Sequence, residues 1–129
     1  MKARVRELTS RRTVNDYEKW KIDLKQYVVG WVNYYKLADI GSYLQRIDEW
    51  MRKRIRMVFW KKWKRVRTRW RNLLKLGISN RNAGILANSR KGYWRIASSP
   101  ILQTALSNER LEKAGFQFFY SYYRKSVAA

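Results

Sequence analysis

The residues of this chain best suited to chemistry are concentrated in one run from Arg52 to Arg71, RKRIRMVFWKKWKRVRTRWR. The run contains eleven Lys or Arg residues and four large aromatic residues, but no Asp or Glu. Such cations attract phosphate groups, and aromatic rings can stack on bases. The run therefore indicates a polyanionic partner, and nucleic acid fits it best.

The charge of the whole chain supports this interpretation. Its 129 residues include 30 basic and 9 acidic ones, which gives a net charge of +21. Charge of one sign at this density repels itself in a compact fold unless a counter-charged partner relieves it. At 46% hydrophobic residues, with seven Trp and nine Tyr, the chain still has enough apolar material for a core. We therefore expect a folded domain rather than a disordered basic tail.

The composition argues against catalysis. The chain has no Cys and no His, which removes disulfides, thiolate and imidazole metal sites, Cys nucleophiles and Ser/His/Asp triads. Carboxylates come close along the chain at Asp48 with Glu49 and at Glu109 with Glu112, and we interpret these as solvated or capping groups. No pair resembles the two metal-binding aspartates of a polymerase or nuclease. We expect no catalytic residue, metal or cofactor.

Two other classes of partner remain open. Basic amphipathic helices also bind anionic membranes, but here the longest apolar face is better explained as core. No apolar run approaches the roughly 20 residues that cross a bilayer, and the start MKARVRELTS has no apolar signal segment, so we expect an intracellular, soluble protein. A protein-binding module is the second alternative, because exposed aromatic residues also form interface hot spots.

The apolar spacing predicts an all-α fold with about three longer helices followed by several short ones. The longer helices are expected at residues 2–11, 15–37 and 42–64, with capping residues from Thr13 to Asp16. The second has apolar positions that step by three or four, and the third has an apolar stripe. These residues are Trp20, Leu24, Tyr27, Val28, Trp31, Tyr35 and Ala38 in the second helix, and Leu44, Ile47, Met51, Ile55 and Val58 in the third.

Shorter helices are predicted after residue 64. One spans 68–76 and is closed by Gly77, and the next is capped by Ser79 and ends near residue 88. Residues 89–95 are predicted to be a loop, whose Trp94 either stacks on a base or fills a gap between helices. A helix with Pro100 at its first position runs to 106, and a last one runs from 108 to Gly115. The tail GFQFFYSYYRKS is expected to fold back on the domain.

Projection of the third helix at 100° per residue separates its stripe from a basic face. On that face two Trp residues lie among the cations, and they either receive another helix or meet a ligand. The members of this face are Arg46, Arg52, Lys53, Arg56, Trp60, Trp63 and Lys64.

Five short motifs are found along the chain: GWVNYY at 30–35, WMRKRIR at 50–56, WKKWK at 60–64, LGI at 76–78 and ANSRKGYWR at 87–95. Together they resemble the maturase region of bacterial group II intron-encoded reverse transcriptases. They occur in the same order and at similar spacing in that family. Residues 1–65 resemble the thumb, also called the X or maturase domain, and 66–129 resemble the linker and the start of the DNA-binding region.

The resemblance implies a maturase that binds structured group II intron RNA and assists splicing, and that holds the template-primer duplex, or DNA, with a polymerase palm. It also implies a fingers-palm polypeptide as a further partner and no membrane partner. It places the protein in the bacterial cytoplasm or nucleoid, associated with RNA. The catalytic Asp-Asp motif of the palm and the His-containing nuclease domain have no counterpart, so the chain resembles a thumb without its polymerase: an excised piece, one part of a split protein, or a remnant reading frame. A nonspecific nucleic-acid-binding helical protein remains the alternative.

We predict two basic patches as the RNA contact surface. Their residues are Arg46, Arg52, Lys53, Arg56, Trp60, Lys61, Trp63, Lys64, Arg65, Arg67, Arg69 and Arg71, with Arg90, Lys91 and Arg95 in the second patch. Trp31, Tyr34 and Tyr35 are assigned to structure, and Gly30 is expected to let a neighbouring helix approach. The sequence departs from the family at Val29, where a basic residue is common, and at Val66, in a run that often contains Pro. The second change allows the third helix to continue further.

Overall fold

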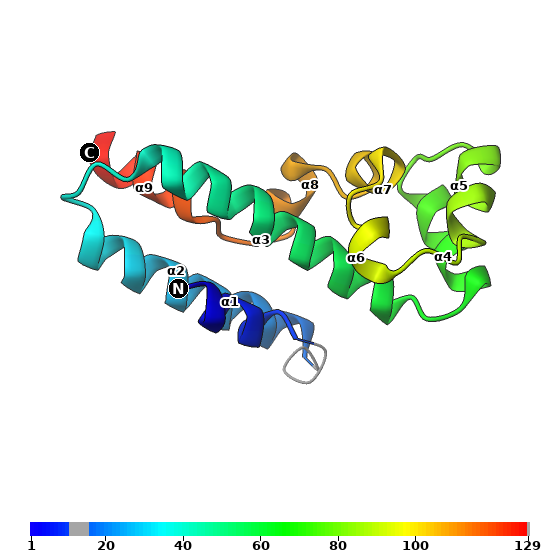
Figure 1. The fold of residues 1–129 in the computed structure, drawn as a ribbon, viewed down its shortest axis with the longest axis horizontal. Helices are drawn as coiled ribbons and strands as arrows, with labels where there is room; N and C mark the ends of the chain where they lie inside the picture. The colour runs from blue at the N-terminus through cyan, green and yellow to red at the C-terminus, as the bar shows by residue number, and fades with distance from the viewer. Residues whose placement is uncertain (11–15, 129) are drawn as a thin grey trace. The chain divides into compact units, whose positions relative to one another are not determined.

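The computed structural model describes residues 1–10 and 16–128, and every regular element in that part of the chain is an α-helix (Figure 1). This confirms the predicted all-α fold. The capping position predicted at Thr13 lies outside the described residues. None of the described helices is both long and apolar enough to cross a membrane.

The described helices follow the predicted order, but two rather than three of them are long, because α1 has only seven residues. They are α1 (Lys2–Leu8), α2 (Tyr17–Tyr35), α3 (Gly41–Lys62), α4 (Val66–Lys75), α5 (Asn80–Ala87), α6 (Tyr93–Ile96), α7 (Pro100–Ala105), α8 (Asn108–Lys113) and α9 (Phe119–Ala128).

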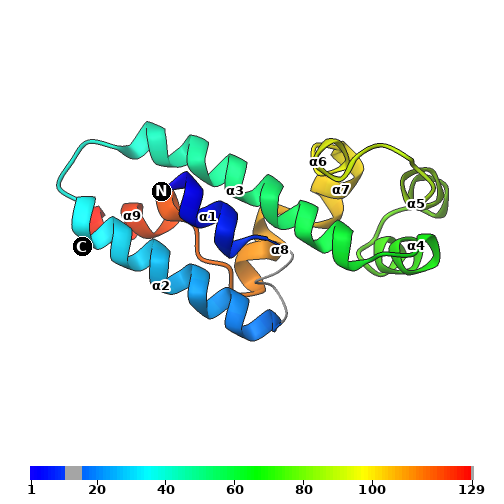
Figure 2. The same cartoon turned by 60° about the horizontal axis from the view of Figure 1, so that its bottom comes forward.

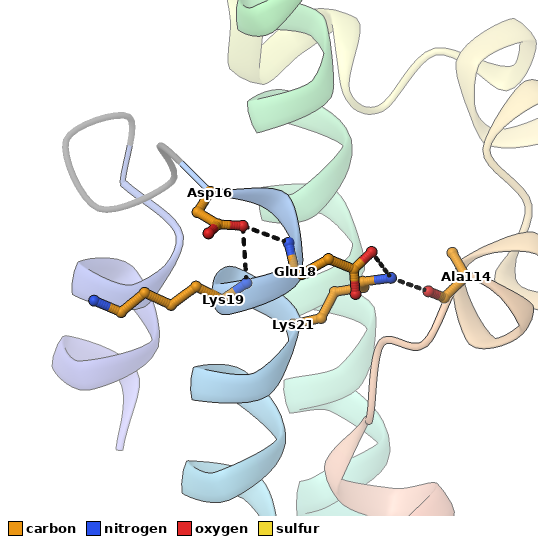
Figure 3. A network of polar contacts seen from close by, with 5 residues as sticks. All are labelled: Asp16, Glu18, Lys19, Lys21 and Ala114. Atoms are coloured by element: carbon orange, nitrogen blue, oxygen red, sulfur yellow. Dashed lines mark hydrogen bonds and ion pairs between the residues drawn. The ribbon is translucent and has the colours of Figure 1, made fainter.

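The helix ends are set by local side chains and glycines. The Asp16 carboxylate accepts hydrogen bonds from the backbone N–H groups of Glu18 and Lys19 at 3.0 and 3.3 Å, which caps α2 (Figure 3). The Ser79 hydroxyl accepts from the N–H of Asn82 at 3.3 Å and caps α5, as predicted. Gly77 adopts φ +90°, and the N–H of Ile78 donates to the carbonyl of Leu73, so α4 ends in a Schellman motif.

Three predicted element boundaries were wrong. Residues 93–95 are helical rather than loop, because α6 buries Ile96 within one turn. The helix beginning at Asn108 is not the last, since the aromatic tail forms α9. Finally, α3 ends two residues before the predicted residue 64. It ends at Lys62, where the Arg69 guanidinium donates to the carbonyl of Trp60 from Nε at 3.3 Å and from Nη2 at 3.1 Å.

The chain divides into two compact units. The first unit comprises Met1–Arg52 and Glu112–Ala129, and the second unit comprises Lys53–Leu111. Helix α3 belongs to both, and its first half lies in the first unit. This division rests on packing alone, so the family-based boundary after residue 65 stays a prediction.

The core of the first unit forms between α2, α3 and the tail. On α2 the buried residues are four successive i, i+4 positions: Trp20, Leu24, Val28 and Val32. The stripe predicted for α3 is buried throughout, at Leu44, Ile47, Met51, Ile55 and Val58, with the last two in the second unit.

Helix α9 packs along α2, which confirms that the tail folds back (Figure 2). The buried Phe119 ring meets two α2 rings edge to face, Tyr27 at 6.2 Å and Trp31 at 5.7 Å between centroids. Just before α9, Phe116 packs on Trp20 with ring centroids 4.8 Å apart. The tail therefore supplies aromatic rings to the core of the first unit.

The structural roles predicted for Gly30, Tyr34 and Tyr35 were wrong. Tyr34 is 79% exposed and Tyr35 is also exposed, because the inner line of α2 passes through Val28 and Val32 and leaves these rings outside it. Trp31 is half-buried at the edge of that line. Gly30 is exposed, and a Cβ built there would meet no atom within 4 Å, so no neighbouring helix requires a glycine.

Asp48 caps α9 from the middle of α3. Its two carboxylate oxygens accept from the backbone N–H groups of Phe119 and Tyr120 at 2.8 and 2.9 Å. Burial raises the pKa of Asp48 to about 6, while these two N–H donors and then the charge of Arg52 act to lower it. The capping role was one of the two alternatives that the sequence left open for this carboxylate.

Lys21 joins α2 to the turn after α8 (Figure 3). Its ammonium group donates to the carbonyl of Ala114 at 2.7 Å and lies 3.2 Å from the carboxylate of Glu18. The side chain of Lys21 is only 15% exposed, so this cation is held by the fold and is not offered to a ligand.

Candidate nucleic-acid interface

The positive charge is distributed unevenly between the two units. Residues 53–111 contain sixteen basic residues and one acidic residue, Glu109, so the second unit holds +15 of the net +21. The first unit contains fourteen basic and eight acidic residues. One carboxylate cannot neutralise sixteen cations, so the second unit carries the field that would attract a polyanion.

Helix α4 presents cations along one face. Arg67, Arg71 and Lys75 follow one another at i, i+4 spacing, and all three are exposed. The helix is held from its other side by Leu73, which is fully buried. Like charges at this spacing destabilise an isolated helix, and a bound anion would remove that cost.

Two aromatic rings of α6 lie beside cations of the same unit. The Lys53 ammonium is 4.0 Å from the centroid of the Trp94 ring, which is 40% exposed. Tyr93 is also exposed, and both the Lys61 ammonium at 5.4 Å and the Arg69 guanidinium at 5.8 Å approach its ring. Trp94 therefore does not fill a gap between helices, and its cation contact leaves part of the ring accessible.

Two residues of the predicted contact surface belong to the core instead. Trp60 is 1% exposed and packs its ring edge to face with Trp63. Arg56 is 6% exposed and donates from Nε to the carbonyl of Leu106 at 2.8 Å, and from Nη2 to Asn108 at 2.9 Å. The face that looked outward on the isolated helix is covered by later segments of the second unit.

Other residues of the predicted contact surface make contacts within the fold or are half-buried. Arg69 places its guanidinium 4.6 Å from the centroid of the Trp60 ring, in addition to its bonds to the Trp60 carbonyl. Lys53, Lys61 and Trp63 are half-buried. Arg52, in the first unit, is half-buried over the Phe118 ring at 5.1 Å, and its buried Nε has no hydrogen-bond partner among the described residues.

The predicted residues that remain fully available are exposed cations. In the second unit these are Lys64, Arg65, Arg67, Arg71, Arg90, Lys91 and Arg95, while Arg46 is exposed in the first unit. For these residues the contact with RNA stays a prediction.

Sequence reasoning left several exposed residues of the second unit out of the contact surface, among them Trp70, Lys75 and Arg81. Lys75 continues the i, i+4 series of Arg67 and Arg71, so helical periodicity was the signal for it. Arg81 lies in the first turn of α5, and Trp70 had been counted only as part of the basic run. No group of three or more acidic residues among the described residues could hold a metal ion.

The family model described as group II intron, maturase-specific domain matches residues 1–77. The match covers more than half of the chain and includes α1 to α4, and the chain belongs to this family. The maturase-specific domain is not itself the catalytic part of group II intron-encoded proteins, and its function is related to splicing of the intron. No curated protein matches the chain.

Proposed function

We propose that this chain binds structured group II intron RNA and so helps the intron reach its splicing-competent fold. The observation that carries the proposal is the charge of the second unit, where sixteen cations accompany one carboxylate. Part of that charge belongs to α4, which lies inside the family match. Membership of a maturase family supports intron RNA as the target of this charge.

Physical chemistry explains why such a protein needs no catalytic residues. Folded RNA brings phosphates close together, and a helical surface rich in cations lowers their repulsion. Side chains that contact bases in unpaired segments can then select particular loops. In this account the intron RNA carries out the splicing chemistry, and the protein contributes only binding.

A second role is proposed for the first unit. In a complete reverse transcriptase this domain would hold a template-primer duplex beside the palm, so a fingers-palm polypeptide is a candidate partner. The supporting observation is an apolar surface at the end of α2, where Tyr34 is 79% exposed and the following Leu37 is 98% exposed. Such a surface suits a protein contact better than a phosphate. We place this activity in the bacterial cytoplasm, associated with RNA.

The proposed RNA binding should depend steeply on salt. Each phosphate contact releases condensed counterions, which contributes roughly 0.7 to 0.9 log units of affinity per tenfold change in salt. With four to six contacts, the logarithm of the association constant should fall with a slope of about −3 to −5. Fluorescence anisotropy of a labelled intron-derived hairpin between low and moderate KCl would measure this slope.

A neutral osmolyte series is the control, because it changes hydration without adding counterions. Blunt duplex DNA of equal charge tests selectivity in the same assay, and equal affinity for it would favour a nonspecific nucleic-acid-binding protein. A slope near zero for the hairpin would refute the electrostatic account of binding.

A further inference from the structure

A groove of about 420 Å³ lies between α4 and α5 in the second unit. Neither of the two roles proposed above assigns a ligand to it. Its lining comes from Val66, Arg67 and Trp70 on α4, from Gly84 on α5, and from Asn88 directly after α5. The two helices lie side by side in both views (Figures 1 and 2). The groove is therefore built within one compact unit.

The apolar wall of the groove is an indole held in place. Trp70 is 39% exposed, although its Nε1 donates to the side-chain oxygen of Asn80 on α5 at 3.1 Å. Val66, one turn earlier on α4, is also exposed. An exposed ring whose orientation is already set by a hydrogen bond loses little freedom when a flat group stacks on it.

Gly84 keeps the opposite wall open. A Cβ built at this position would meet no protein atom within 4 Å, so packing does not require glycine there. Glycine also weakens a helix relative to alanine, and Gly84 lies inside α5. A side chain at this position would project into open space at the groove, and its absence leaves room for a ligand.

The polar groups of the groove match those of a nucleotide. The Asn88 side-chain nitrogen donates to the carbonyl of Gly84 at 2.8 Å, which orients the amide and leaves its oxygen as an acceptor. Arg67 supplies a cation beside the indole, and Arg71 continues the same exposed helix face. A base amino group could reach the amide oxygen while a phosphate meets the guanidinium.

We propose that this groove receives one unpaired nucleobase of the bound RNA, stacked on Trp70, with its phosphate near Arg67. The inference rests on the proposed function, since it assigns a subsite within the RNA-binding surface. A nucleotide fits the groove better than a peptide side chain because it combines a flat ring with an adjacent anion. The cations around the groove have no acidic neighbours closer in sequence than Glu49 and Glu109.

The test uses two variants of the full chain that alter the groove in different ways. Gly84→Leu fills it, and Trp70→Ala removes the stacking face, while Trp70→Phe keeps an aromatic ring. Asn82→Leu is the matched control, because it adds the same side chain to an exposed position of α5 that does not line the groove. Circular dichroism on heating establishes that each variant is folded.

Binding is measured against two RNAs with equal numbers of phosphates, a hairpin with an unpaired loop and a blunt, fully paired duplex. The Gly84→Leu and Trp70→Ala variants should bind the hairpin roughly tenfold more weakly than the wild type, because each loses one stacked base. Duplex binding should be unchanged, Trp70→Phe should retain most of the hairpin affinity, and Asn82→Leu should equal the wild type.

The outcomes separate this inference from the proposed function. If the wild type binds neither RNA, both are overturned. If it binds the hairpin but the folded Gly84→Leu variant binds it equally well, only the nucleobase subsite is overturned, and a polypeptide side chain becomes the alternative occupant. An equal loss for hairpin and duplex would also overturn the subsite, because it would show a general effect on charge or fold.

Discussion

Replacing Trp60 by Ala should lower the free energy of unfolding by roughly 3 to 5 kcal/mol, the usual cost of removing a large buried aromatic side chain. The ring is 1% exposed, packs on Trp63, and supports the Arg69 guanidinium 4.6 Å from its centroid. Its loss would leave a cavity where α3 ends and α4 begins. Urea denaturation followed by far-ultraviolet circular dichroism would measure the change.

Trp94→Ala is the matched control for this experiment. That ring belongs to the same unit but is 40% exposed, so its removal should change the free energy of unfolding by about 1 kcal/mol or less. If Trp60→Ala left stability unchanged and weakened RNA binding, Trp60 would be a ligand-stacking residue and its burial in the second unit would be refuted.

Arg56→Ala should lower the free energy of unfolding by roughly 2 to 4 kcal/mol. This loss is expected even though the change also reduces the repulsion between positive charges. The carbonyl of Leu106 would lose its donor in a buried environment, which alone costs about 1 to 3 kcal/mol, and the packing of the arginine stem would be lost as well. Thermal and urea denaturation of the variant should both show the loss.

Arg65→Ala provides the comparison for Arg56, because it removes the same side chain from an exposed position just before α4. Its stability should stay within about 0.5 kcal/mol of the wild type. The two variants should therefore rank oppositely in two assays, with Arg56→Ala affecting stability and Arg65→Ala affecting RNA affinity. Equal stability of the two variants would contradict the buried role of Arg56.

Local sequence patterns were enough to predict most of the helices. The apolar stripe of α3 from Leu44 to Val58 is buried as periodicity indicated, and Ser79 and Gly77 set helix ends through their own short-range chemistry. On α2 the pattern was broader than the core it described. Aromatic residues such as Tyr35 are apolar enough to enter the stripe, but their exposure depends on where the neighbouring helices end.

The candidate site was less predictable because it depends on contacts between distant residues. Trp60 and Arg56 share a helix face with exposed cations, and nothing in their immediate sequence shows that Leu106 and Asn108 meet the arginine fifty or more residues later. The opposite error was made for Trp70, which was left out of the predicted contact surface although it is exposed. Its place beside a groove follows from the packing of α5 on α4, which brings Gly84 and Asn88 to the same surface.

Some cations of the chain are held by hydrogen bonds within the fold, whereas others are exposed and can contact RNA. Lys21, Arg56 and Arg69 each donate to backbone carbonyls, so they hold the fold. Exposed cations without such a bond occur in both units, and four of those in the second unit lie close together in sequence around the start of α4. These four are Lys64, Arg65, Arg67 and Arg71.

If the second unit binds RNA, substitution of these four residues by Gln should weaken the binding. The control replaces four exposed lysines of the first unit, Lys19, Lys25, Lys36 and Lys113, and so removes the same charge. Affinity for the intron-derived hairpin at one fixed salt concentration is the measurement, with circular dichroism to confirm that both variants fold. The second-unit variant should bind at least about tenfold more weakly than the control variant. Equal affinity of the two variants would contradict a binding surface in the second unit.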